Sequence, residues 1–228
     1  MKPLRSYLLA TASSVALIGS AAAQPPAPPI MSWAGPYIGL NAGAAWRSSS
    51  FSNPDAFGTI IADPIWSDRA TSFVGGGQIG YNWQSGNLVF GVEGDIDGVS
   101  GNSSAATSGG TQSSSKLDWM STIRGRAGVT VSPRFLAYLT GGAAFAHFSD
   151  AWGFAPTGND FTSNGMRAGW TGGGGLEYMF DPHWTARIEG LYADFGTQNQ
   201  TTVYASSTYR SGFKHTVTLL RGALNWKW

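Results

Sequence analysis

The sequence predicts an all-β protein, a single eight-stranded, antiparallel, up-and-down transmembrane β-barrel. Three observations lead to this fold class: segments with period-two alternation, connections that are alternately short and long, and charges confined to one face of the segments. The composition agrees with it. Of the 228 residues, 12% are charged and 42% are hydrophobic, and 32 are glycine. A mean hydropathy of −0.10 argues against a helical membrane protein.

Charge and residue content exclude several other classes. The net charge is +1 and no cluster of Lys and Arg is visible, so we expect no nucleic-acid partner. The 10 Trp, 8 Tyr and 12 Phe are too many for a disordered chain. Cysteine is absent, which excludes disulfides, a thiolate nucleophile and Cys-based metal sites. No cofactor is expected.

The first residues form an export signal. Lys2 and Arg5 give a positive start, residues 7–18 are a short apolar run, and small residues end at Ala23. We expect residues 1–23 to be a signal peptide cleaved after Ala23. Residues 24–32 are rich in proline and predict an extended periplasmic segment, and residues 33–228 form the barrel.

The eight expected strands alternate between an apolar face and a small or polar face. In the first, Ile38 and Leu40 lie on the apolar face. In the fourth, we place Leu117 on the apolar face and Asp118 on the polar one. The fifth is apolar on both faces, so its orientation stays open. Each is about as long as a tilted strand that crosses a bilayer. The segments are 37–46, 71–83, 88–97, 117–131, 135–148, 168–180, 184–194 and 215–228.

Connection lengths give the barrel a direction. Residues 84–87, 132–134 and 181–183 are tight turns with Gly, Asn, Ser, Pro or Asp. The connections 48–69, 98–116, 149–167 and 196–214 are long and follow the first, third, fifth and seventh strands. Short periplasmic turns and long surface loops are typical of outer-membrane barrels.

The polar face carries four acids and four bases in the middle of strands. A soluble barrel of the lipocalin kind would turn its charged face to water. In a membrane barrel this face points into the lumen, because Arg facing lipid costs about 2–4 kcal/mol at the midplane. The expected lumen charge network is Glu93, Asp95, Arg124, Arg126, Glu177, Arg187, Glu189 and Arg221. We expect Glu93 and Asp95 to meet Arg124 and Arg126 toward the outer half of the barrel, with lumen glycines leaving room.

Aromatic residues gather near the ends of the apolar face, as in interfacial girdles. They are Trp46, Trp83, Trp119, Phe180, Trp184, Trp226 and Trp228. Further aromatics lie in the long connections and could pack on the rim or contact a ligand: Phe51, Phe57, Trp66, Trp152, Phe154, Phe161 and Tyr209.

Motifs that could signal chemistry have simpler explanations here. Gly75-x-Gly77-x-x-Gly80 matches a dinucleotide-binding pattern, but no helix follows it. Glu93, Asp95 and Asp97 share a face and could suggest a cation site; salt bridges to arginine explain them better, and the pattern lacks the remaining ligands of a calcium loop.

The three histidines do not form a catalytic motif. His147, His183 and His215 are scattered: Asp181-Pro182-His183 is ordinary turn chemistry, and neither His147 nor His215, near the outer rim, has an adjacent Ser or acid motif. We therefore expect no enzyme, and no catalytic, cofactor-binding or metal residues.

Several ordered motifs resemble those of the alphaproteobacterial porin-family outer-membrane β-barrel proteins. They are Trp-Ala-Gly-Pro-Tyr-Ile-Gly at 33–39, Gly-Gly-Gly-Gln-Ile-Gly-Tyr-Asn-Trp at 75–83, Phe-Gly-Val-Glu-Gly-Asp at 90–95, Gly-Trp-Thr-Gly-Gly-Gly-Gly-Leu-Glu-Tyr at 169–178 and Arg-Gly-Ala-Leu-Asn-Trp-Lys-Trp at 221–228. The resemblance implies a small eight-stranded surface barrel, often called a porin without being a proven pore. It also implies an assembly signal at Trp226 and Trp228, although the family usually ends in Phe. Some members are linked to haem binding or host contact, but no residue here carries that over.

The expected function is structural: support of the envelope and presentation of surface loops from the cell outer membrane. A narrow channel for small solutes is the alternative, and a ligand-binding or host-contact surface protein is the third. The expected partners are outer-membrane lipid, lipopolysaccharide and the barrel-assembly machinery, and a host or small-molecule ligand of the loops is unknown.

Overall fold

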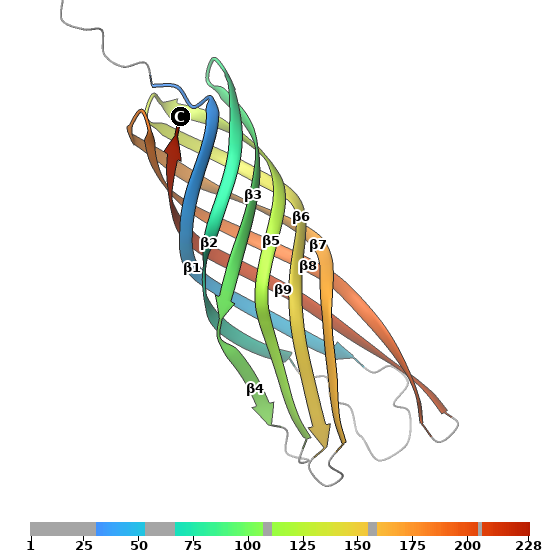
Figure 1. Ribbon diagram of the computed structural model, residues 1–228. Helices are drawn as coiled ribbons and strands as arrows, with labels where there is room; N and C mark the ends of the chain where they lie inside the picture. The colour runs from blue at the N-terminus through green and yellow to red at the C-terminus, as the bar shows by residue number, and fades with distance from the viewer. Residues whose placement is uncertain (1–30, 53–66, 107–110, 155–158, 205–206) are drawn as a thin grey trace, which may run out of the picture.

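The computed structural model describes residues 31–52, 67–106, 111–154, 159–204 and 207–228 (Figure 1). The predicted signal peptide, residues 1–23, and most of the Pro-rich segment lie outside these residues. Within them, no α-helix is long and apolar enough to cross a membrane. The strands are β1 (Gly35–Ser52), β2 (Ser67–Ser85), β3 (Leu88–Ser100), β4 (Asn102–Ala106), β5 (Thr111–Ser132), β6 (Phe135–Phe154), β7 (Asn159–Asp181), β8 (Trp184–Tyr204) and β9 (Ser207–Lys227).

The strands close into one antiparallel barrel. β1 pairs with both β2 and β9, and the remaining strands follow in order to β5, which also pairs with β3. β3 and β4 occupy one place in the wall, because both pair with β5 and are separated only by Gly101, whose φ is 144°. The wall therefore has eight places, which confirms the predicted eight-stranded barrel.

The two ends of the barrel differ. Three tight turns and the C-terminus lie at one end, which we call the short-turn end (Figure 1). At Gly86 the first turn needs a left-handed φ of 58°, which glycine adopts without strain. Long hairpins extend from the other end, which we call the hairpin end (Figure 1).

The long connections are shorter than predicted, because the strands continue into them. The ladder between β8 and β9 runs on to Tyr204 and Ser207, and β1 pairs with β9 as far as Ser52. These stretches are rich in Ser and Thr and lack an apolar face, so hydrophobic alternation could not reveal them. Backbone pairing between two consecutive strands holds them as hairpins.

Alternation along the strands sorts the side chains as predicted. Leu40 is 72% exposed on the outer wall, whereas Asn41 is buried in the lumen. The open orientation of the fifth segment is also resolved: Leu136 and Tyr138 point inward, and Leu139 is 74% exposed.

The predicted faces of Leu117 and Asp118 were wrong. β5 has a register shift between Leu117 and Trp119 opposite β6, so Asp118 is an extra residue in the ladder. Such a bulge exchanges the faces of everything beyond it. Leu117 is consequently buried in the lumen, while Asp118 is half-exposed and pairs with Lys116 at 2.8 Å.

The lumen is filled in three layers. The middle layer holds the ion-paired acids and arginines; the buried Arg47 lies beyond it on the hairpin side, and the buried Lys227 lies at the short-turn end. An apolar layer lies on the hairpin side of the middle layer, consisting of Ala45, Val74, Leu117, Met120, Ala144, Ala146, Phe148, Leu191, Ala193, Phe195, Val217 and Leu219. A second apolar layer lies at the short-turn end, consisting of Trp33, Val89, Leu136, Tyr138 and Met179. The lumen is thus less uniformly polar than the strand patterns predicted.

Candidate functional site

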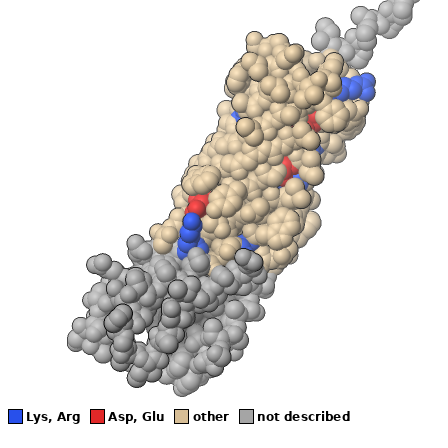
Figure 2. Space-filling view, turned by 180° about the vertical axis from the view of Figure 1, so that it is seen from behind, with Lys and Arg blue, Asp and Glu red and all other residues tan. Residues whose placement is uncertain are grey.

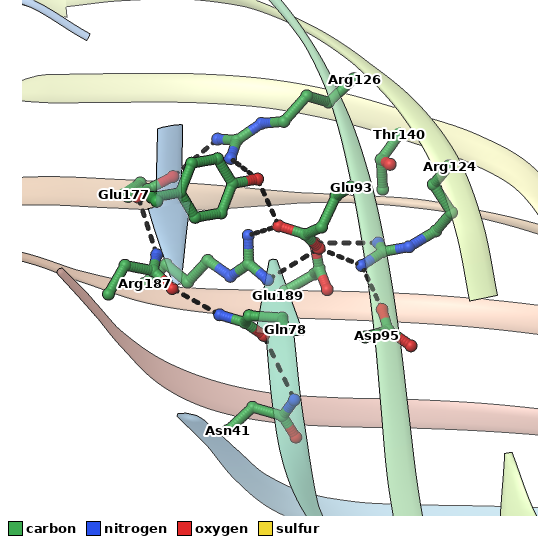
Figure 3. A network of polar contacts seen from close by, with 12 residues as sticks. Asn41, Gln78, Glu93, Asp95, Arg124, Arg126, Thr140, Glu177, Arg187 and Glu189 are labelled. Atoms are coloured by element: carbon green, nitrogen blue, oxygen red, sulfur yellow. Dashed lines mark hydrogen bonds and ion pairs between the residues drawn. The ribbon is translucent and has the colours of Figure 1, made fainter. Parts of the chain in front are cut away.

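The middle layer of the lumen brings the eight charged residues singled out by the sequence into one polar network. Figure 3 labels all of them except Arg221. All eight are at most 7% exposed. Each stands on a lumen-facing strand position, because a period of two turns every second side chain inward. Asp97 is also buried and joins them, which gives five acids and four arginines.

One ion pair spans the full width of the barrel. Glu93 on β3 accepts hydrogen bonds from both terminal nitrogens of Arg187 on β8, at 2.5 and 2.8 Å. In the ring of eight places, β8 lies four places from β3 in either direction. These two strands are therefore diametrically opposite, and the bidentate pair crosses the centre of the lumen.

Two further arginines bind several acids at once. Arg124 pairs with Glu93, with Asp95 at 2.8 Å and with Glu189 at 3.1 Å. Arg221 pairs with Asp95 at 2.8 Å and with Glu189 at 2.9 Å. Because each guanidinium carries five N–H donors in a planar fork, it can satisfy carboxylates from different strands.

Arg221 also reaches Asp97 on β3, at 2.6 Å. Together, Arg124 and Arg221 join β3, β5, β8 and β9 through side chains alone. The network therefore links β3 and β5 to β8 and β9, two pairs of strands that share no backbone ladder with each other.

Arg126 forms its own ion pair toward the short-turn end, and it is linked to the other charges through the hydroxyl of Tyr37, to which it donates at 3.2 Å. It donates to Glu177 on β7 at 2.6 Å, and its guanidinium carbon lies 4.1 Å from the centre of the Tyr138 ring. Glu177 also accepts hydrogen bonds from Thr185 at 2.6 Å and from Asn225 at 3.0 Å. All its partners are buried with it, so the whole pair is shielded from bulk solvent.

The expected geometry of the β3 acids was only partly right. Glu93 does stand directly opposite Arg124. Arg126, however, turns away to Glu177 and is opposite Gly91, not an acid. Glu93 lies five residues from the tight turn at Leu88, which at about 3.3 Å per residue and a tilt near 40° is roughly 13 Å. The network consequently sits near mid-height and not in the outer half.

Sequence reasoning missed the neutral members of the network. Tyr37 donates its hydroxyl proton to Glu93 at 2.6 Å, and Tyr138 donates to Glu189 at 2.8 Å. Gln78 donates to Asn225 at 2.5 Å. Tyr37 and Gln78 lie in strands with regular alternation, so their positions on the lumen face could have been predicted from the sequence. Tyr138 lies in the strand that is apolar on both faces, where no such signal exists.

Lumen glycines make room for the large side chains. A Cβ atom added at Gly43 would collide with Arg221, and one added at Gly80 would collide with the ring of Tyr37. The lumen glycines therefore make the charged layer possible, because a narrow barrel has space for four arginines only where other lumen positions carry no side chain.

The histidines and acids do not gather into a metal centre. Among the described residues, no group of three or more His, Cys, Asp or Glu side chains is placed to hold a metal ion. His147 stacks on Trp119, and His183 lies in a tight turn beside Lys227. His215 lies 3.0 Å from the hydroxyl of Ser49, its directly opposed partner on β1.

The contact between Ser49 and His215 had no signal in the sequence, because 166 residues separate the two positions. Strand pairing alone brings them together. A serine and a histidine side by side do not define a hydrolase without oxyanion donors and an orienting group.

Comparison with known proteins identifies the fold family. The family model described as outer membrane protein beta-barrel domain matches residues 13–213. The chain belongs to this outer-membrane β-barrel family. It is 36% identical over 231 residues to the 31 kDa outer-membrane immunogenic protein of Brucella melitensis, covering 96% of this chain and 95% of that protein.

Two other similarities extend the comparison. The 22 kDa outer membrane protein of Rhizobium leguminosarum is 34% identical over 182 residues, which cover 78% of this chain and 72% of the relative. The crystal structure of Neisserial surface protein A aligns with a TM-score of 0.43 and 17% identity, covering 85% of this chain and 97% of that structure. The family model and the Brucella and Rhizobium relatives are outer-membrane proteins, which places this family member in the cell outer membrane.

The outer wall of this outer-membrane barrel suits lipid. Charged side chains are few on the face shown in Figure 2. Trp83, Phe180, Trp184 and Trp228 are exposed around the short-turn end, and Trp46 is exposed nearer the hairpin end. By the general asymmetry of such barrels, the short-turn end faces the periplasm and the hairpin end faces outward.

Proposed function

We propose that the protein is a structural component of the outer membrane, a closed barrel that supports the envelope and presents hairpins outside the cell. The observation that carries this proposal is the bidentate pair between Glu93 and Arg187, which joins opposite walls across the centre of the lumen. A solute or ion moving along the axis would have to break it.

The free-energy cost of opening the buried ion pairs favours a closed lumen over a conducting one. Removing one partner from a buried ion pair costs about 3–5 kcal/mol. Moving Arg187 aside would leave the charge of Glu93 partly uncompensated. Arg124, which also pairs with Glu93, is shared with Asp95. A route through the middle layer therefore requires several buried pairs to open together. Eight-stranded barrels generally have interiors filled by side chains, in contrast to the 16–18 strands of aqueous porins.

The apolar layers add to this seal. Phe148, Leu191 and Leu219 fill the lumen on the hairpin side of the charges, and Trp33 fills it at the short-turn end with 1% exposure. The backbone N–H of Trp33 donates to the side chain of Gln84 at 2.7 Å, which fixes the chain where it enters the barrel at the short-turn end. Apolar constrictions exclude water and ions.

Two assays separate the structural role from a channel. Proteoliposomes should show no swelling in small sugars, whereas a 16-stranded porin in the same vesicles gives rapid swelling. A strain lacking the protein should release more outer-membrane vesicles and become sensitive to detergent, and wild-type protein should restore it. Swelling that depends on the folded protein, or a deletion strain with an unchanged envelope, would overturn the proposal.

A further inference from the structure

The barrel wall splits between β7 and β8 at the hairpin end. Their ladder stops at Trp170 opposite Asp194. Beyond it, β7 pairs only with β6, while β8 pairs with β9. A bulge in β8 begins at the same point: the register against β9 shifts between Asp194 and Thr197, and Gly196 between them has a φ of 71°.

A shallow hollow of about 470 Å³, mostly open to the outside, lies at this split. Trp170, Asp194, Gly196, Thr197 and Lys214 are among its lining residues. Trp170 is 56% exposed on the outer wall, and its ring contacts that of Tyr192 at 5.6 Å between centres. The edge of the hollow nearer the short-turn end is thus aromatic and apolar.

The edge of the hollow nearer the hairpin end is cationic. The ammonium of Lys214 lies 3.3 Å from Asp194, and the side chain of Lys214 remains 49% exposed. An ammonium has three donors, so the contact with Asp194 leaves capacity for a second acceptor. The other carboxylate oxygen of Asp194 accepts the N–H of Gly196 at 2.8 Å, which fixes the carboxylate and thereby the position of Lys214.

The height of the hollow matches the outer boundary of the membrane. Along β8, Asp194 lies ten residues from Trp184, which belongs to the aromatic ring at the short-turn end. At about 3.3 Å per residue and a tilt near 40°, this separation is roughly 25 Å, the height of the apolar band of such barrels. Trp170 therefore lies where acyl chains end and Lys214 lies at headgroup level.

We propose that this hollow binds the phosphorylated headgroup of an outer-leaflet glycolipid, the lipid A portion of lipopolysaccharide. Lys214 binds a phosphate, while the rings of Trp170 and Tyr192 pack against the adjoining acyl chain. Asp194 positions the ammonium and does not contact the lipid. The proposal rests on the outer-membrane location and is independent of whether the lumen conducts.

The test compares two lysines at the rim. The full-length refolded protein in detergent is titrated with fluorescent lipid A that carries both phosphates, with its dephosphorylated form, and with phosphatidylglycerol. Lys214→Gln should weaken binding of the phosphorylated lipid about tenfold, the effect of one lost charge-assisted contact. Lys116→Gln is the matched control, because Lys116 is similarly exposed and also paired with an acid, Asp118, on β5.

The outcomes separate the possible lipids. Dephosphorylated lipid should bind wild-type protein and Lys214→Gln equally. Trp170→Ala should weaken every lipid with acyl chains, whatever its headgroup. Equal affinity of wild type and Lys214→Gln for phosphorylated lipid A, or an equal loss in Lys116→Gln, overturns the site. A Lys214-dependent affinity for phosphatidylglycerol as high as for lipid A overturns the glycolipid assignment. A mobility shift on heating verifies that each variant is folded.

Discussion

The pair between Arg126 and Glu177 provides the sharpest energetic test of the filled lumen. Arg126→Met keeps much of the aliphatic volume and removes the charge. The lost terms are a charge-assisted hydrogen bond of about 1.5–3 kcal/mol and a desolvated cation–π contact with Tyr138 of about 2 kcal/mol. We therefore expect the free energy of unfolding to fall by about 3–5 kcal/mol, the range for breaking a buried pair.

The second variant of the cycle is Glu177→Gln. It removes the charge but keeps an oxygen that can accept from Thr185 and Asn225, the neutral partners of Glu177. The single variant leaves Arg126 uncompensated and should also be destabilised. The double variant should recover much of the loss, because neither charge is stranded, so we expect a coupling of about 2 kcal/mol or more.

Urea unfolding of the refolded protein in lipid vesicles, followed by tryptophan fluorescence, measures these values. The same cycle on Lys116 and Asp118 is the control. That pair is at the surface, 2.8 Å apart, with side chains 52% and 27% exposed, so its coupling should stay below about 1 kcal/mol. A coupling below about 0.5 kcal/mol between Arg126 and Glu177, as for independent sites, would refute a dry lumen at this layer.

Other predictions address the closed wall, the mouth and assembly. The folded protein should resist SDS at room temperature and shift its mobility on boiling, because a closed barrel has no free edge within the membrane; identical mobility before and after boiling would contradict closure. Trp33→Ala should lower the free energy of unfolding by about 3–5 kcal/mol in the same urea assay, since it empties a buried aromatic site. Cysteine at position 92 should react with a membrane-soluble maleimide, and cysteine at 93 should not, because Val92 is exposed on the outer wall and Glu93 is buried; the reverse pattern would contradict the faces. Trp228→Ala should reduce the amount of protein assembled in the outer membrane, as measured by surface biotinylation, while normal levels would refute its role as an assembly signal.

The sequence was most informative where strand alternation was regular. Glu93 and Arg124 follow alternating strands, so their lumen position could be predicted from parity alone. The predicted face of Leu117 was wrong because a bulge at Asp118 exchanges the inward and outward positions of the strand. No residue pattern in the sequence indicates this bulge. Bulges are a local property of pairing between two strands, which a single strand does not encode.

Partners across the lumen were harder to predict than positions. Adjacent strands follow from chain order, which suggested that Arg126 would meet the β3 acids. The real partner, Glu177, lies two places away in the ring. Such contacts depend on barrel curvature and on the relative height of nonadjacent strands. The split at Asp194 was equally hidden, because it depends on where the β7–β8 ladder ends.

Single-channel recording in planar bilayers tests the central claim most directly. Folded, heat-modifiable wild-type protein should insert without producing conductance steps, because the Glu93–Arg187 pair and the apolar layers close the lumen. Reproducible ohmic steps that require the folded barrel, and that change in size when Arg187 is replaced by alanine, would contradict the account and show a conducting lumen.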